Sequence, residues 1–191
     1  SVPHIMVDLS VTLRDMINAC AEKLKCTRLS VSPERLDRSC FVIASKSHIE
    51  YMVMMSLALL FCMSKSRYIA VNQLYTFDRV CLSFRTDTDA DKRTVSSIAK
   101  VLNTGELCDE KNELYFYAMY IRTITELHAG NVYMEHDMSS GRLEIRITFP
   151  AVKDDTITFE NEIPILAEYA ELAETVFYTL VEGFELGGEP R

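Results

Sequence analysis

The chain has 191 residues, of which 48% are hydrophobic and 25% are charged, proportions that are typical of a globular protein. Its longest apolar stretch, residues 52–63, is too short to span a bilayer, and no leader peptide is visible, so we expect no direct membrane insertion. The net charge of −8 belongs to residues 153–191, which carry ten acids and two bases, because the eighteen acids and eighteen bases of residues 1–152 cancel. A body without a basic excess does not suit a nucleic-acid backbone, so we expect no nucleic-acid partner.

The six cysteines form no C-x-x-C pair, and with the four histidines they give no zinc-binding spacing. Most of them lie in apolar runs, where a free cysteine packs as a small hydrophobic side chain. We therefore expect free thiols, a reducing and cytoplasmic location, and no metal site.

The N-terminal third predicts a helix, two strands and a second helix. Residues 8–24 have apolar side chains at helical spacing, with Asp8 or Ser10 as the N-cap. Two strand-like segments, 27–32 and 40–45, follow on either side of a turn-prone segment that contains Pro33. Residues 47–63 are apolar on nearly every face, which predicts a central buried helix.

The next segments predict a hairpin, two helices and a second hairpin. They are, in order, strands at 67–75 and 79–86, a loop and short helix at 87–103, a helix at 113–127, and strands at 131–137 and 142–150. Strands and helices come in blocks rather than in strict alternation, which predicts an α+β protein, a two-layer α/β sandwich.

A boundary is expected after the last strand, because Pro150 ends it. We expect one domain over residues 1–152 and an acidic C-terminal extension over residues 153–191. The extension predicts an amphipathic helix that begins at Pro164 and ends at Glu182. Its apolar face is formed by Ile165, Leu166, Tyr169, Leu172, Val176, Phe177 and Leu180.

Two segments carry a resemblance to a known family. "VDLSVTLRDMINACAEKL" resembles the first helix of the ATP-binding domain of sensor histidine kinases, and "ELHAGNVYMEHDMSSGRLEIRITFP" resembles that domain's closing helix and hairpin. The similarity spans residues 7–150, and the same superfamily includes gyrase, Hsp90 and MutL-type ATPases. It implies a mixed sheet with helices on one face, and in the working enzymes a site for ATP and Mg²⁺.

The chain departs from this family where the nucleotide ligands should be. The family's Mg²⁺-binding asparagine matches the face of residues 47–63 that carries Met55, Ser56 and Leu59, and a hard cation needs oxygen ligands. The family's adenine-binding Asp-x-Gly-x-Gly matches a segment without glycine. The pocket residues that we expect from this segment are Thr86, Asp87, Thr88 and Ala90, with either Asp87 or Thr86 in register with the family's aspartate.

The third departure concerns the start of the helix at 113–127. The family begins this helix with Gly-x-Gly, whose backbone N–H groups hold phosphate. Counting back from "ELHAG" places these glycines at Tyr115 and Tyr117, whose rings would take up the volume of a triphosphate. The resemblance therefore implies a nucleotide-binding scaffold with a closed pocket, and we expect both tyrosines to stand in the former phosphate site.

Three hypotheses follow for the function. The first is a non-catalytic signalling module, a degenerate histidine-kinase ATP-binding domain that acts through protein contacts and needs no cofactor. The second is a divergent but working ATP- and Mg²⁺-dependent histidine kinase domain of a two-component system. The third is a dimerisation or interaction module that works through the helix at 164–182. We expect no catalytic residue, and for His128 we expect a structural role.

Overall fold

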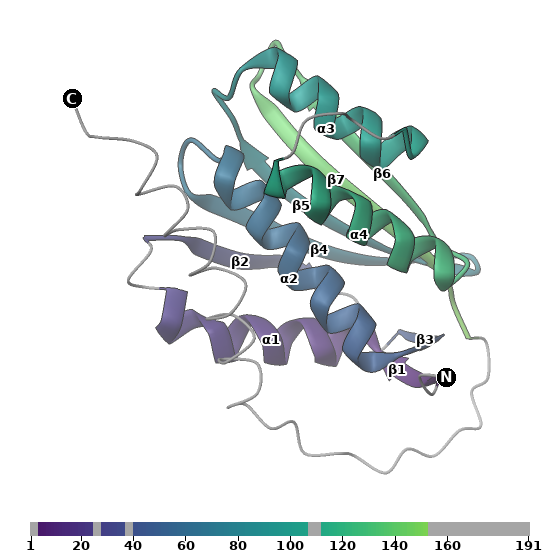
Figure 1. The fold of residues 1–191 in the computed structure, drawn as a ribbon. Coiled ribbons are helices and arrows are strands. Elements are labelled where there is room, and N and C mark those ends of the chain that lie inside the picture. Colours follow the sequence, from purple (N-terminus) through teal and green to yellow (C-terminus); the bar gives the residue numbers. More distant parts are fainter. Residues whose placement is uncertain (1–3, 25–27, 37–39, 107–111, 153–191) are drawn as a thin grey trace.

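In the computed structural model, which describes residues 4–24, 28–36, 40–106 and 112–152, four helices cover one face of a five-stranded sheet (Figure 1). The first elements are β1 (Ile5–Asp8), α1 (Leu9–Leu24), β2 (Ser30–Leu36), β3 (Phe41–Ala44) and α2 (Lys46–Met63). They are followed by β4 (Tyr68–Thr76), β5 (Arg79–Asp87), α3 (Lys92–Thr104), α4 (Glu113–Leu127), β6 (Asn131–Asp137) and β7 (Arg142–Pro150).

The main sheet is mixed, with strand order β2-β4-β5-β7-β6. Strand β2 runs parallel to β4, and the other neighbours are antiparallel. A separate two-stranded antiparallel sheet pairs β1 with β3. The prediction of an α+β fold with a mixed sheet and helices on one face is confirmed.

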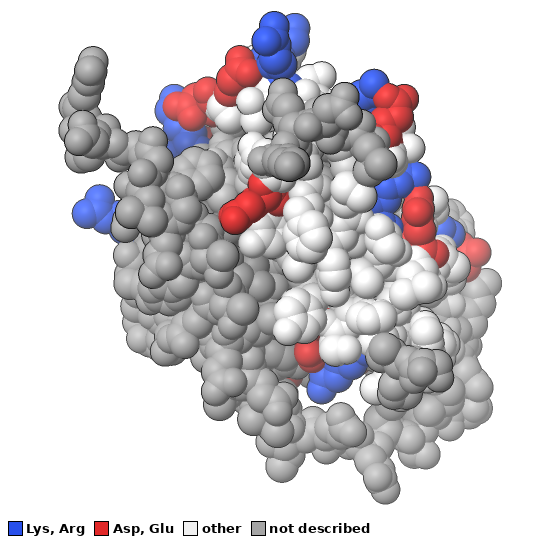
Figure 2. Space-filling view, in the orientation of Figure 1, with Lys and Arg blue, Asp and Glu red and all other residues white. Residues whose placement is uncertain are grey.

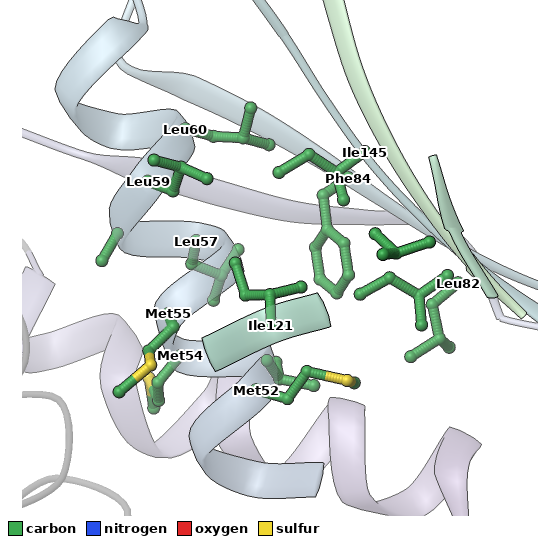
Figure 3. Packing of buried hydrophobic residues seen from close by; sticks show 14 of the residues in the cluster. Met52, Met54, Met55, Leu57, Leu59, Leu60, Leu82, Phe84, Ile121 and Ile145 are labelled. Atoms are coloured by element: carbon green, nitrogen blue, oxygen red, sulfur yellow. The ribbon is translucent and has the colours of Figure 1, made fainter. Parts of the chain in front are cut away.

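The core lies between the sheet and the helices, and α2 is at its centre (Figure 3). Every second side chain of β5 and β7 points to the helices, as a half-buried sheet requires. Among the described residues these are Val80, Leu82 and Phe84 in β5 and Leu143, Ile145, Ile147 and Phe149 in β7, each at most 1% exposed. The prediction of a central buried helix is confirmed, since most of α2 is buried.

The helices and both hairpins lie where the sequence predicts them. Asp8 is the N-cap of α1, because its Oδ1 accepts hydrogen bonds from the backbone N–H groups of Ser10 at 3.0 Å and Val11 at 3.2 Å. The predicted turn after residue 32 is wrong, since β2 continues through Pro33 to Leu36. Proline is tolerated there because β2 is an edge strand and its register shifts between Pro33 and Arg35.

The last described residues close the body against the small sheet. The N–H of Ala151 donates to the carbonyl of Asp78, and that of Val152 donates to the carbonyl of Phe41 in β3, both at 2.8 Å. The extension and the predicted helix at 164–182 lie outside the described residues. Within the described ranges, no helix is both long and apolar enough to cross a membrane.

Candidate functional site

The nine residues predicted to line the former pocket come from three elements that meet at the C-terminal end of α2. Met55, Ser56 and Leu59 belong to α2 itself, Tyr115 and Tyr117 to the start of α4, and Thr86, Asp87, Thr88 and Ala90 to the end of β5 and the loop after it. Helix α2 packs along α4 and over β5. The backbone also joins α2 to β5, because the N–H of Lys65 donates to the carbonyl of Asp87 at 3.0 Å.

The α2 part of the site offers no ligand for a hard cation. Met55 is 8% exposed, and Ser56 and Leu59 are fully buried. The hydroxyl of Ser56 donates to the carbonyl of Met52, one turn earlier, at 2.8 Å. The one side-chain oxygen among these three residues is therefore engaged within its own helix.

The end of β5 settles which residue faces the helices. Thr86 shares the buried side of the strand with Leu82 and Phe84, and its hydroxyl donates to the carbonyl of Tyr68 at 2.7 Å. A second hydroxyl, that of Ser64 just after α2, lies 2.6 Å from Thr86 Oγ1. Asp87 alternates to the other side of the sheet.

Asp87 is held on that other side by Ser66. The hydroxyl of Ser66 donates to Asp87 Oδ1, and the backbone N–H of the same serine donates to it at 3.2 Å. The side-chain hydrogen bond is the main reason why the pKa of Asp87 lies below its usual value. Asp87 is therefore a charged anchor for the α2–β4 connection.

The loop after β5 is tied to the second hairpin. The N–H of Thr88 donates to the carbonyl of Gly141 at 2.8 Å, and the hydroxyl of Thr88 accepts from the N–H of Ala90 at 3.0 Å. Ala90 packs against the edge of the core. The segment that resembles a glycine-rich loop is therefore fixed by its own hydrogen bonds.

Both tyrosines at the start of α4 are buried. Tyr115 is 5% exposed and Tyr117 8% exposed, whereas Phe116 between them is 63% exposed. Burial raises the pKa of Tyr117, and the neighbouring Glu113 and Cys62 raise it further. Tyr117 thus lies beside the last turn of α2. That this volume corresponds to a phosphate site stays a prediction.

Two neighbours of Tyr117 were not predicted as site residues. Burial, with a smaller effect from Glu113, raises the pKa of Cys62 to about 12, so its thiol is not ionised at neutral pH. Glu113 occupies the first turn of α4, where a carboxylate interacts favourably with the helix dipole and would repel a phosphate. The sequence offered one signal for this placement: Glu113 directly follows Asn112, a residue typical of helix N-caps, which indicates that Glu113 lies in the first turn of a helix.

The N-terminus of α4 is capped by the chain itself. Asn112 Oδ1 accepts from the N–H of Leu114 at 2.9 Å, and the Asn112 carbonyl accepts from the N–H of Tyr115 at 3.1 Å. These are donors that a phosphate-binding helix would present to its ligand.

His128 connects the two central helices at their other end. Its Nδ1 lies 2.7 Å from the carbonyl of Ile124, and its Nε2 accepts from the N–H of Ser45 at 3.1 Å. Since a carbonyl can only accept, Nδ1 carries the proton and the ring is neutral. Burial lowers the pKa of His128, as do His4 and His48, whose ring centroids lie 5.2 and 5.6 Å away, while the bond to Ile124 acts against them. These bonds fit the structural role expected for His128.

Metal ligands do not assemble in the described part of the chain. No group of three or more His, Cys, Asp or Glu side chains there could hold an ion. Asp91, in the acidic loop after β5, is the N-cap of α3 and accepts from the N–H of Thr94 at 3.1 Å.

Sequence comparisons gave no relative. No protein-family model matches the sequence. No curated protein matches it.

Solved structures, in contrast, match the fold across most of the described residues. The nucleotide-free catalytic domain of histidine kinase ThkA matches with a TM-score of 0.62 and 13% identity, over 77% of this chain and 95% of that domain. The mycobacterial sensor histidine kinase MprB matches with a TM-score of 0.58 and 13% identity, over 78% and 97%. The ATP-binding domain of PrrB from Mycobacterium tuberculosis gives 0.56 and 12%, over 78% and 98%.

At this level of identity the likeness concerns the fold. The matched region covers a mixed sheet with helices on one face, as the resemblance of residues 7–150 implies. The chain therefore has the fold of the catalytic, ATP-binding domains of sensor histidine kinases.

Proposed function

We propose that the chain is a non-catalytic signal-transduction module, a degenerate form of the histidine-kinase ATP-binding domain with a closed nucleotide pocket that acts through protein–protein contacts. In this proposal the domain keeps the fold of a kinase catalytic domain but takes no nucleotide and no Mg²⁺. It would transmit a signal by binding and releasing other proteins.

The observation that carries the proposal is that the polar groups at the positions matching the family's nucleotide ligands are already hydrogen-bonded to other groups of this chain. Hydroxyls of Ser56 and Thr86 donate to backbone carbonyls, and Asp87 accepts from Ser66. A ligand in the pocket would have to break the bonds of Ser56 and Thr86, and breaking a buried bond without replacing it costs about 1–3 kcal/mol per group. The phenol rings of Tyr115 and Tyr117 would have to move as well.

A weakly charged outer surface supports the part of the proposal that concerns protein contacts. The face over α4 and the N-terminal half of α2 carries few charges (Figure 2). The exposed side chains of these two helices include Phe116, Met119 and Leu127 of α4 and Tyr51 of α2, which are 40–63% exposed. Exposed apolar side chains on a surface with few charges are typical of protein-binding surfaces.

A divergent, working ATP-binding kinase domain is the second candidate. It is favoured by the fold, because the catalytic domain of ThkA and the ATP-binding domain of PrrB share it. Residues outside the family's usual positions would then supply the ligands. The third candidate, an interaction module that works through residues 164–182, rests on the sequence of that segment alone.

A nucleotide titration of the full chain separates the first two candidates. Thermal unfolding is followed with ATP and ADP, with and without Mg²⁺, and repeated by calorimetry. A ligand present at ~100 times its Kd and bound to the folded state alone adds about 2.7 kcal/mol of stability, which is easily measured. The proposal expects no stabilisation up to millimolar nucleotide.

Two variants make this titration sharper. Tyr115→Gly with Tyr117→Gly restores the family's glycine pattern, and Phe116→Gly changes the exposed ring between them as a control. Nucleotide binding by the double variant alone would identify the tyrosines as the obstacle. Mg²⁺-dependent stabilisation of the unmodified chain would overturn the proposal in favour of the kinase candidate.

A further inference from the structure

Strand β6 forms one outer edge of the five-stranded sheet, and its geometry suits pairing with a further strand. It pairs with β7 over all seven of its residues without a register shift. In an antiparallel pair, successive residues direct their backbone groups alternately to the partner strand and to the free edge. Such an edge is a template for a strand of another chain, and folded proteins suppress this pairing by local devices.

The side chain of Asn103 occupies the middle of this edge. Asn103 lies in the last turn of α3, and α3 packs on β6 (Figure 1). Its Oδ1 accepts from the backbone N–H of Met134 at 2.7 Å, and its Nδ2 donates to the carbonyl of the same residue at 3.0 Å. A single side-chain amide thus makes the two hydrogen bonds that a residue of an adjacent strand would make with Met134.

The bonds of Asn103 also identify which residues of β6 face the edge. Because the backbone of Met134 bonds to α3, Val132 and His136, two residues away on either side, direct their N–H and carbonyl groups to the same edge. Among the described residues, none is hydrogen-bonded to these groups of Val132 and His136. The edge therefore offers three positions for pairing, and Asn103 closes the central one.

The opposite edge of the sheet is protected in a different way. Strand β2 contains Pro33, which has no backbone N–H, and its register shifts between Pro33 and Arg35. Proline and an irregular register both make an edge strand a poor template for pairing. Strand β6 contains no proline and pairs regularly, so a residue outside the strand has to protect it.

We propose that Asn103 closes the β6 edge against pairing with a second copy of this chain. A second copy is the partner that fits, because the three positions are self-complementary. Two antiparallel β6 strands related by a two-fold axis at Met134 place Val132 opposite His136 and Met134 opposite itself, so that every edge N–H meets a carbonyl. This role of Asn103 does not depend on whether the pocket binds nucleotide.

Removing the amide of Asn103 should open the edge. Sedimentation velocity over a range of concentrations compares Asn103→Ala with the unmodified full chain, after circular dichroism has shown that both are folded. The dimer dissociation constant of Asn103→Ala should be at least tenfold lower. Val101→Ala, which truncates a buried side chain of the same helix, is the control for lost packing and should leave the constant unchanged. Adding His136→Pro to Asn103→Ala removes an N–H from the edge and should restore the original constant.

Amide hydrogen exchange, followed by nuclear magnetic resonance, locates the pairing surface. In the unmodified chain the N–H of Met134 should exchange at least tenfold more slowly than those of Val132 and His136, because Asn103 accepts from Met134 alone. In Asn103→Ala all three should exchange fast when dilute and should become protected together as the concentration rises. If Asn103→Ala does not fold, Asn103→Ser, whose hydroxyl is too short to make both bonds, takes its place.

Three results would overturn the proposal. A folded Asn103→Ala that associates no more tightly than the unmodified chain would mean that the edge stays closed without the amide. Equal self-association of Val101→Ala would assign the effect to lost packing of α3. Exchange at Met134 of the unmodified chain as fast as at Val132 and His136, or equally slow exchange at all three, would mean that Asn103 is not the group that closes the edge.

Discussion

At the residue scale, the buried ring of Tyr117 fills the space between the start of α4 and the last turn of α2. Its ring is 8% exposed and lies near Glu113 of its own helix and Cys62 of α2. A tyrosine is uncharged at neutral pH, and burial raises the pKa of Tyr117 further, so no charge has to be buried along with the ring. Tyr117 therefore acts as a hydrophobic wedge between the two helices.

Removing this ring should destabilise the fold. We expect Tyr117→Ala to lower the free energy of unfolding by about 3 kcal/mol, the usual effect of deleting a buried aromatic side chain. Tyr117→Phe should cost less than about 1 kcal/mol, because the ring remains. Urea unfolding followed by circular dichroism measures both. Phe116→Ala, one residue earlier and exposed, is the matched control, and an equal loss there would contradict the wedge role.

His128 should make stability depend on pH in the weakly acidic range. Its pKa in the folded protein is below the unfolded value of 6.5, so the unfolded chain takes up the proton first. Stability should therefore fall as the pH decreases from about 6.5 and level off below the pKa of the folded state. The depressed pKa of Asp87 acts at lower pH, below the usual aspartate value of 3.8, so the two effects separate.

The test is a series of urea unfolding curves between neutral pH and pH values just above the range of the carboxylates. His128→Gln should be less stable than the unmodified chain but should show a flatter pH dependence. His136→Gln, which alters a half-buried histidine of β6, should keep the original slope. A slope unchanged in His128→Gln would assign the pH dependence to another group.

At the scale of elements, the packing at the end of α4 explains why the "LHAG" segment ends in glycine. Ala129 has a φ of 55°, the left-handed region that favours glycine, whereas Gly130 has ordinary φ but no room for a side chain. A Cβ on Gly130 would lie 2.6 Å from the carbonyl oxygen of Thr148 and 2.8 Å from the ring of Phe149. The tight approach of α4 to β7 therefore requires glycine at residue 130.

Opposite substitutions in this turn should have opposite effects. We expect Ala129→Gly to raise stability by about 0.5 kcal/mol, since it relieves the left-handed backbone. Gly130→Ala should lower stability by about 2 kcal/mol, because the clash is with backbone. Gly105→Ala is the comparison: its new Cβ would meet the flexible side chain of Arg122, and the left-handed φ of 74° adds about 1 kcal/mol of backbone strain, so it should cost less than Gly130→Ala. Thermal unfolding ranks the three, and a milder effect at Gly130 than at Gly105 would contradict the packing argument.

Helices and hairpins were predictable because their signals are local. Residues 47–63 are apolar all round, and the two hairpins alternate with turn residues between their strands. Strand β1 was missed because its four residues give no alternation of their own and pair with β3, more than thirty residues away. The edge position that lets Pro33 lie in β2 is likewise a property of the sheet.

The candidate site was predictable only in part, for the same reason. The absence of glycines after β5 and the tyrosines at the start of α4 can be read from the sequence. The partners that fix these residues are distant in the chain: Tyr68 for Thr86, Ser66 for Asp87 and Gly141 for Thr88. The choice between Thr86 and Asp87 as the residue that faces the helices needed the register of β5.

At the scale of the whole molecule, the two sheets share one core. Val42 of β3 is 1% exposed and Val80 of β5 is 0% exposed, and both belong to the same cluster of buried side chains. Backbone bonds from Ala151 and Val152 also tie the end of β7 to the β4–β5 turn and to β3. The small sheet is thus part of the same folding unit as the large one.

The described body should therefore unfold in a single cooperative step. Val42→Ala and Val80→Ala remove the same two methyl groups from different sheets, and each should lower the free energy of unfolding by about 2 kcal/mol. Far-ultraviolet circular dichroism and tyrosine fluorescence should give one coincident urea transition for each variant, shifted to the same midpoint. Two transitions, with Val42→Ala moving one of them alone, would show that β1 and β3 fold separately. A single transition would mean that losing core contacts of the small sheet destabilises the helices α2 and α4 as well, because all the described elements then unfold together.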